Sequence, residues 1–203
     1  MPINRLIEGF KSFRETYYEK QPEFYRVLVN KGQRPDVMVI ACSDSRVNPS
    51  ILTKAEPGEI FIVRNVANLV PPYKPDSHYH GTSAAIEFAV RDLKVEHVIV
   101  LGHSHCGGIQ RLCRKNSGDE EREFIDSWVS IVDTAWAASH DLEPGMRDME
   151  KKAIEVSLDN LMTFPWVKSG VDAGNMDIRG WWFDLEAGEL LENDGSDNWK
   201  KVT

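Results

Sequence analysis

The sequence predicts an α/β fold: a mostly parallel central β-sheet flanked by helices, with N-terminal helices and a C-terminal hairpin at the sheet edge. Residues 37–41 and 98–101 are apolar without alternation, which is typical of parallel strands covered on both faces. Helical patterns lie between the apolar runs, as in parallel strand–helix–strand units. Near the C-terminus, residues 178–185 and 189–191 flank Glu-Ala-Gly and indicate an antiparallel hairpin.

At the N-terminus, apolar residues recur at helical spacing on both sides of Pro22. These residues are Ile3, Leu6, Ile7, Phe10, Phe13, Phe24, Val27 and Leu28. We therefore expect two helices hinged near Gln21-Pro22. They form an arm of about residues 1–32 on a single domain of residues 1–203.

The elements that follow are marked by caps and by prolines. Asn48 can cap a short helix that has Pro49 at its first position. Thr82 or Ser83 can cap the helix that leads to the third strand, and Gly102 ends that strand. The remaining expectations are a strand at 60–63, a loop at 69–80, and helices through 109–112, 124–138 and 147–162.

Composition limits the class of protein. The chain has 203 residues, of which 41% are hydrophobic, and this is enough for one sizeable core. Its formal net charge of −8 argues against nucleic acid or an anionic membrane as a partner. Three cysteines do not make a disulfide framework, and no apolar run approaches the length needed to span a membrane. We expect a cytoplasmic protein.

The candidate metal ligands are Cys42, His103 and Cys106. Cys42 follows the first apolar run, and His103 and Cys106 follow the third. Parallel α/β sheets place their functional sites just beyond the carboxyl ends of the strands, so neighbouring strands would bring these three side chains together. Three protein ligands leave one coordination position open, and that arrangement is typical of catalytic zinc.

The motifs in this region carry a resemblance to a known family. The pattern Cys42-x-Asp44-Ser45-Arg46, followed by His103-x-x-Cys106-Gly107-Gly108, resembles the β-class carbonic anhydrases. The segments 57–59, 64–68 and 83–87 and the closing hairpin are similar to the family as well, so the resemblance covers nearly the whole chain.

The resemblance implies one Zn²⁺ per chain, held by Cys42, His103 and Cys106, and the reversible hydration of carbon dioxide to bicarbonate and a proton. Zinc-bound hydroxide would attack the carbon. Asp44 would orient that hydroxide, and Arg46 would hold Asp44 through a forked ion pair. Two thiolates and one imidazole cancel the charge of the zinc, so we expect a rate that rises toward alkaline pH.

The expected substrate-binding residues are Gln33, Phe61, Val66, Phe88 and Gly107. Carbon dioxide is apolar and needs apolar walls, and the helix that starts at Gly107 presents its positive end to the thiolates. In the family, a glutamine at the position of Gln33 reaches in from a second subunit. The resemblance therefore implies a homodimer or a larger even-numbered homo-oligomer.

One departure from the family pattern concerns its subtype. Members with an inhibitory bicarbonate pocket have a tryptophan three residues before the first cysteine, an arginine and a late tyrosine. Here Val39 takes the first position and Arg64 is present, while the late aromatic residues 181–183 carry no hydroxyl group. We expect the constitutively open type.

The sequence leaves two alternatives open. An enzyme of the same fold could hydrolyse carbonyl sulfide or carbon disulfide with the same zinc hydroxide. A non-catalytic zinc module could act as a regulatory protein, although the intact Asp44 and Arg46 argue against it.

Overall fold

The computed structural model describes residues 3–116, 119–133, 145–193 and 198–202. The chain forms two compact units, residues 1–34 and 35–203. In the described part of the chain, no helix is long and apolar enough to cross a bilayer.

The first unit is helical, as the apolar spacing predicts. Helix α1 (Ile3–Arg14) continues into a π-helical segment (Glu15–Lys20), and α2 (Pro22–Lys31) follows. Gln21 leaves the helical conformation between them, with φ −128° and ψ 56°, so the predicted hinge is confirmed. Aromatic side chains, including Phe13, Tyr17 and Tyr25, pack together around this hinge.

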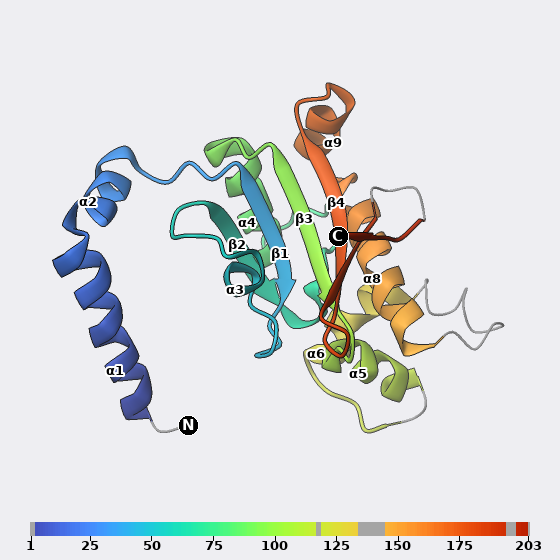
Figure 1. The fold of residues 1–203 in the computed structure, drawn as a ribbon. Coiled ribbons are helices and arrows are strands. Elements are labelled where there is room, and N and C mark those ends of the chain that lie inside the picture. Colours follow the sequence, from blue (N-terminus) through green and yellow to red (C-terminus); the bar gives the residue numbers. More distant parts are fainter. Residues whose placement is uncertain (1–2, 117–118, 134–144, 194–197, 203) are drawn as a thin grey trace. The chain divides into compact units, whose positions relative to one another are not determined.

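The second unit is built on a six-stranded sheet with the order β2-β1-β3-β4-β5-β6 (Figure 1). Its strands are β1 (Val37–Cys42), β2 (Ile60–Asn65), β3 (His97–His103), β4 (Asp177–Asp184), β5 (Glu189–Asn193) and β6 (Lys200–Val202). The first four strands in this order pair in parallel, and β5 and β6 pair antiparallel. The predicted α/β fold and its edge hairpin are confirmed, whereas β6 was not expected.

The helices of this unit are α3 (Pro49–Thr53), α4 (Gly81–Glu87), α5 (Gly107–Asn116), α6 (Ile125–Val129), α8 (Met146–Leu161) and α9 (Pro165–Asp172). A π-helical segment, Phe88–Leu93, extends α4. Helices α4, α8 and α9 supply the side chains that pack on one face of the central strands. A smaller cluster, which includes Val39, Ala41 and Val47, lies on the opposite face.

Asn48 does cap α3, because its side chain accepts a hydrogen bond from the Ser50 N–H at 3.1 Å. The expectation for α4 is wrong, since the helix already begins at Gly81 and the His80 carbonyl accepts the N–H of Ala84. The expected helix 124–138 is α6 followed by a short 3₁₀ turn, and its last five residues lie outside the described ranges.

The prediction that Gly102 ends the third strand is also wrong. Strand β3 continues to His103, because β4 runs beside it and pairs Gly102 with Trp182. A glycine is needed here for packing: a Cβ atom at this position would lie 2.7 Å from Cδ1 of Ile154 in α8. Gly180 of β4 is needed for the same reason, because a Cβ atom there would lie 2.7 Å from Cγ2 of Ile154. Ile154 therefore occupies a notch in the sheet that the two glycines create.

We predict that Gly180→Ala destabilises the protein by about 1–3 kcal/mol, because the added methyl group overpacks the notch. Urea unfolding followed by tryptophan fluorescence would measure the change. Gly81→Ala is the matched control, since no atom beyond its chain neighbours and its own helix backbone lies within 4 Å of its Cβ position. This control should leave stability unchanged or raise it by up to about 1 kcal/mol. Equal effects of the two substitutions would contradict the packing argument.

Candidate metal centre

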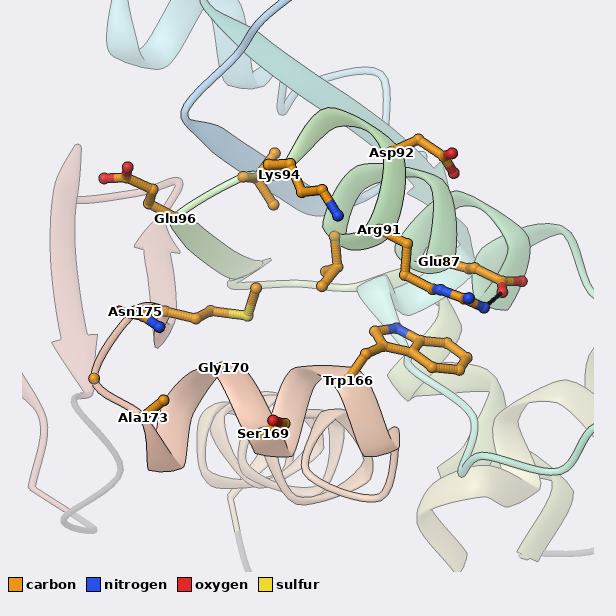
Figure 2. A pocket seen from close by; sticks show the side chains of 14 residues that line it. Glu87, Arg91, Asp92, Lys94, Glu96, Trp166, Ser169, Gly170, Ala173 and Asn175 are labelled. Carbon is orange, nitrogen blue, oxygen red and sulfur yellow. Dashed lines mark hydrogen bonds and ion pairs between the residues drawn. The ribbon is translucent and has the colours of Figure 1, made fainter.

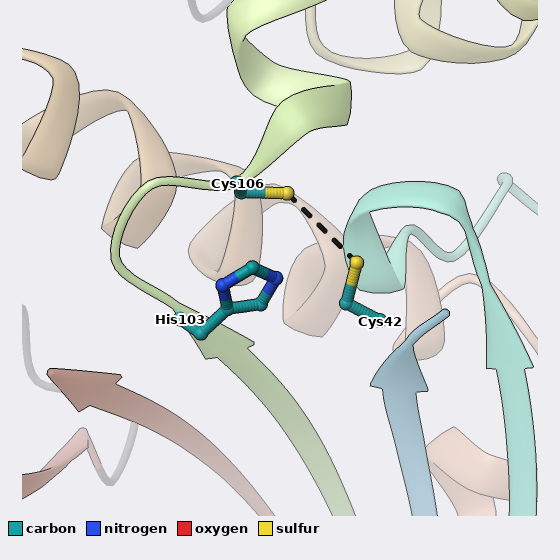
Figure 3. A group of neighbouring side chains, drawn as sticks. All are labelled: Cys42, His103 and Cys106. Atoms are coloured by element: carbon teal, nitrogen blue, oxygen red, sulfur yellow. Dashed lines mark hydrogen bonds between the residues drawn. The ribbon is translucent and has the colours of Figure 1, made fainter. Parts of the chain in front are cut away.

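The three predicted ligands converge at the carboxyl ends of β1 and β3. Cys42 is the last residue of β1, His103 is the last residue of β3, and Cys106 follows in the turn before α5 (Figure 3). All three residues are buried, and their ligand atoms lie within 4.8 Å of one another. The strands meet at this edge because β1 and β3 are parallel and in register, with Ala41 opposite Leu101.

The two cysteine sulfur atoms have the spacing of ligands that share one ion. Their Sγ–Sγ distance is 3.9 Å. This is far longer than the bond of about 2.05 Å in a disulfide. Two thiolates bound to one tetrahedral zinc at about 2.3 Å each would lie about 3.8 Å apart. The sulfur pair therefore fits a tetrahedral zinc ion without rearrangement.

His103 is held in the orientation that a metal ligand needs. Its Nδ1 lies 2.8 Å from the carbonyl oxygen of Ser104, so Nδ1 carries the proton and donates it. Nε2 is then an acceptor. It is buried and has no hydrogen-bond partner among the described residues. Such an anchored imidazole with a vacant second nitrogen is the usual state of a histidine that binds a metal ion.

The electrostatics of the cysteine pair favour a first thiolate. A hydrogen bond donated by the Cys106 thiol, together with His103 and the Asp44 N–H, lowers the pKa of Cys42 to about 4. The hydrogen bond to the Cys42 thiolate, burial and the negative charge of that thiolate raise the pKa of Cys106. The N–H groups of Gly108 and Ile109, at the start of α5, oppose this rise. A divalent cation between the two sulfur atoms would also lower the pKa of Cys106 and so favour the second thiolate.

Asp44 and Arg46 form a forked ion pair beside the ligands. Arg46 Nε donates to Asp44 Oδ1 at 3.0 Å, and Arg46 Nη2 donates to Oδ2 at 2.7 Å. These bonds hold the pKa of Asp44 well below its usual range. Asp44 Oδ2 lies 3.9 Å from His103 Nε2, so the carboxylate faces the ligand group. Arg46 Nη2 also donates to the His105 carbonyl, and this bond joins the loops after β1 and β3.

Arg64 holds the loop that carries this pair. Its guanidinium group donates to three backbone carbonyls, those of Cys42 at 2.9 Å and of Asp44 and Val47 at 2.7 Å. The sequence alone indicated Arg64 only as a feature of one family subtype. The role in the loop was missed because it depends on contacts with backbone atoms, which leave no side-chain pattern in the sequence.

Glu150 is a second residue that the sequence did not single out. It lies on α8, is 2% exposed, and accepts a hydrogen bond from the Cys106 N–H at 3.0 Å. Burial raises its pKa, although the bonds from Cys106 and Trp182 oppose this rise. Glu150 stands 44 residues from Cys106 in the sequence. No local motif signals a contact over that separation.

Among the expected substrate-binding residues, Val66 and Gly107 lie beside the ligand group. Gly107 begins α5 directly after Cys106. A Cβ atom on the next residue, Gly108, would lie 2.7 Å from Cγ1 of Val66, so the first turn of α5 packs tightly against Val66. Val66 is 40% exposed and borders an apolar cavity of about 680 Å³ that Trp128 and Ile131 also line.

Phe61 and Phe88 lie elsewhere in the unit. Their rings pack together at 5.9 Å between centroids, and Phe61 pairs with Met38 near the start of both strands. Phe61 stands four residues before the end of β2, or about 13 Å along the strand. The structure therefore does not bring these two rings to the ligand group, and their role in a substrate pocket stays a prediction. Gln33 belongs to the first unit, and its role stays a prediction.

A larger cavity, of about 1140 Å³, lies at the opposite end of the strands (Figure 2). It is bordered by the end of the π-helical segment after α4 and by α9, and Arg91, Lys94 and Trp166 are among its lining residues. The neighbouring segments lead into the amino ends of β3 and β4. This cavity therefore does not belong to the metal centre.

These features define a class of protein: an α/β protein with a thiolate and imidazole site for a soft divalent metal at the carboxyl edge of its sheet. Comparison with known proteins identifies the family. Residues 37–190 match the family model described as carbonic anhydrase. The chain belongs to the carbonic anhydrase family, and the predicted resemblance to its β class is confirmed. The prediction that the protein is an enzyme of the carbonic anhydrase type is also confirmed.

Curated relatives match over nearly the whole chain. Beta carbonic anhydrase 3 of Arabidopsis thaliana is 39% identical over 194 residues, which cover 92% of this chain and 74% of that protein. A carbonic anhydrase of Synechococcus elongatus is 35% identical over 196 residues, which cover 94% of this chain and 71% of the relative.

Solved structures show the same fold. The β-carbonic anhydrase CcaA is 33% identical, with a TM-score of 0.88 over 99% of this chain and 92% of that chain. A tetrameric β-carbonic anhydrase from Sordaria macrospora, 24% identical, has a TM-score of 0.81 over 98% of both chains.

We predict that Zn²⁺ added to metal-free protein protects Cys42 and Cys106 from alkylation and leaves the alkylation of Cys113 unchanged. Metal binding occupies the first two sulfur atoms, whereas Cys113 lies in α5 outside the ligand group. Mass spectrometry of peptides after a timed reaction with iodoacetamide would measure the three rates. Equal alkylation of Cys42 and Cys106 with and without Zn²⁺ would contradict the assignment.

Proposed function

We propose that the protein catalyses the reversible hydration of carbon dioxide with one Zn²⁺ per chain, held by Cys42, His103 and Cys106. The observation that carries this proposal is the position of the Asp44–Arg46 pair, whose carboxylate faces His103 Nε2 at 3.9 Å. A purely structural metal site has no need of an ionised, anchored carboxylate beside it. Membership of the carbonic anhydrase family supports the same reaction.

When bound, the ion supplies Lewis acidity that lowers the pKa of water, so that a hydroxide nucleophile is available near neutral pH. Cys42 and Cys106 temper this effect, because two thiolates cancel the double positive charge. The rate should therefore rise toward alkaline pH. His103 contributes a neutral ligand nitrogen, and the Ser104 carbonyl keeps its other nitrogen protonated.

Asp44 orients the reacting group. Its lowered pKa keeps the carboxylate ionised, so it can only accept hydrogen bonds. The Arg46 side chain donates one hydrogen bond to each carboxylate oxygen of Asp44. The side of the carboxylate that faces His103 Nε2 can still accept a hydrogen bond from an O–H group. Water, hydroxide and bicarbonate each carry such a donor. Asp44 therefore fixes the direction of the O–H bond, and the oxygen lone pair points at the carbon of the substrate.

The open subtype is part of the proposal. Asp44 is bound by Arg46, and Arg64 donates to carbonyls at the end of β1 and in the loop that follows it. These bonds favour the arrangement in which Asp44 does not close the ligand group. The apolar surface of Val66 borders the position where carbon dioxide would approach.

Stopped-flow measurement of carbon dioxide hydration at pH 7 and pH 8.5, on protein of known zinc content, tests the proposal. We expect turnover that is faster at the higher pH and that chelation abolishes. Asp44→Asn should lower kcat/KM by about 10–100-fold, because an amide presents an N–H group where an acceptor is needed. A flat profile from pH 6 to 9, or full activity in this variant, would contradict the mechanism.

Asp177→Asn is the matched control for Asp44→Asn. Asp177 and Arg179 form an ion pair with the same two-residue spacing, but they lie at the start of β4. The loss of this ion pair in Asp177→Asn should leave the rate of hydration unchanged. A zinc-loaded protein without turnover on carbon dioxide would be assayed with carbonyl sulfide, and activity there would replace the proposed substrate.

A homo-oligomer completes the proposal. Ile3, Leu6, Ile7 and Phe10 share one face of α1 and are each at least 48% exposed. A contiguous apolar face of this kind marks an interaction surface. Light scattering during size-exclusion chromatography should give a dimer or a larger even-numbered oligomer. Phe10→Glu should shift the equilibrium toward smaller species and Lys11→Gln should not, whereas a wild-type monomer would overturn the proposal.

A further inference from the structure

Glu150 is a buried acidic residue that forms a hydrogen bond with the backbone of the ligand Cys106. The proposed mechanism does not use it. A carboxyl group that is 2% exposed is costly unless its oxygen atoms are satisfied. Oε1 accepts the Cys106 N–H at 3.0 Å, and Oε2 accepts the indole N–H of Trp182 at 3.3 Å. Both oxygens act as acceptors, as in an ionised carboxylate.

The position of this carboxylate is set by the packing of α8 on the sheet. Ile154 lies one turn after Glu150 on the same face of the helix. Its side chain fills the notch left by Gly102 and Gly180, and this close approach fixes the height of α8 over β3 and β4. Glu150 is therefore a rigid acceptor that the strands themselves hold in place.

The turn that carries Cys106 needs such an anchor. His105, the residue before it, has φ +57°, a left-handed conformation that residues other than glycine seldom adopt. Several bonds hold this turn. The Ser104 N–H donates to the Phe183 carbonyl of β4, Arg46 donates to the His105 carbonyl, and Glu150 accepts the Cys106 N–H. Of these bonds, the one to Glu150 is made by the N–H of Cys106 itself, so its loss would loosen the backbone from which the Cys106 sulfur projects.

We infer that Glu150 is a positioning residue for the metal centre, which holds the Cys106 thiolate at the distance from Cys42 that one ion requires. This inference rests on the proposed metal site and extends it to α8. The carboxylate does not bind the metal or the substrate. It acts through the Cys106 backbone, whose N–H donates to Glu150 Oε1 at 3.0 Å.

The test compares the affinity of metal-free protein for Zn²⁺, measured by competition with a chromophoric chelator. Glu150→Ala should weaken binding by about 10–100-fold, as the loss of an outer-shell partner typically does. Glu150→Gln keeps the shape and one acceptor atom, so it should give a smaller loss in the same direction. In Co²⁺-loaded protein, the thiolate-to-metal absorption band of Glu150→Ala should change in intensity.

Ser157→Ala is the matched control. Ser157 is a buried polar residue of the same helix, and its hydroxyl bonds to the Ala153 carbonyl and the Val70 N–H, away from the ligand group. It should lower stability but leave both the Zn²⁺ affinity and the Co²⁺ band unchanged. This separates a positioning role from a general loss of stability. If Glu150→Ala does not fold, the Zn²⁺ affinities of Glu150→Gln and Ser157→Ala decide whether Glu150 has a positioning role.

The possible failures can be told apart. In one outcome, the wild-type protein binds Zn²⁺ and hydrates carbon dioxide, and Glu150→Ala and Glu150→Gln bind Zn²⁺ with the same affinity as Ser157→Ala. This outcome would overturn the inference about Glu150 and leave the proposed function intact. Wild-type protein that binds neither metal at this site would overturn both.

Discussion

The parallel pairing of β1 with β3 is the constraint on which the rest of the site depends. Cys42 and His103 are 61 positions apart in the sequence, yet each is the last residue of its strand. Because the strands run side by side in the same direction, both residues reach the same edge of the sheet. The turn after His103 then returns Cys106 to within 3.9 Å of the Cys42 sulfur. An antiparallel pair with the same residues would place them at opposite edges.

This edge is held by backbone contacts that come from several directions. Arg64 fixes the loop after β1 from the side of β2, and Arg46 joins that loop to the turn after β3. From the helical layer, α8 reaches the turn through Glu150. Each contact binds a polar backbone group, and the N–H of Cys106 is buried and would otherwise lack a partner. The site is therefore part of the core, and its geometry and the packing of the sheet cannot vary independently.

The sequence predicts the strands, the hinge of the N-terminal helices and the ligand group because each has a local signal. Apolar runs mark β1 and β3, Pro22 marks the hinge, and motif residues follow the strand ends. Features that depend on long-range contacts carry no such signal. Gly102 looked like the end of a strand, but the structure shows that it leaves space for Ile154 of α8.

The site shows the same division. Its ligands were expected because they follow neighbouring strands, the Asp44–Arg46 pair was expected from the family resemblance, and the structure brings them together. The roles of Arg64 and Glu150 follow only from three-dimensional contacts. Phe61 was expected near the site because β2 leads there, but its place along the strand depends on the register with β1. Register is set by pairing and turns, and a single sequence does not reveal it.

Zinc K-edge X-ray absorption on the purified, zinc-loaded protein tests the central claim most directly, because it counts the sulfur atoms bound to the metal. The account predicts two sulfur ligands at about 2.3 Å and lighter ligands, including one imidazole nitrogen, at about 2.0–2.1 Å. A shell of nitrogen and oxygen atoms alone, or one with a single sulfur, would contradict it.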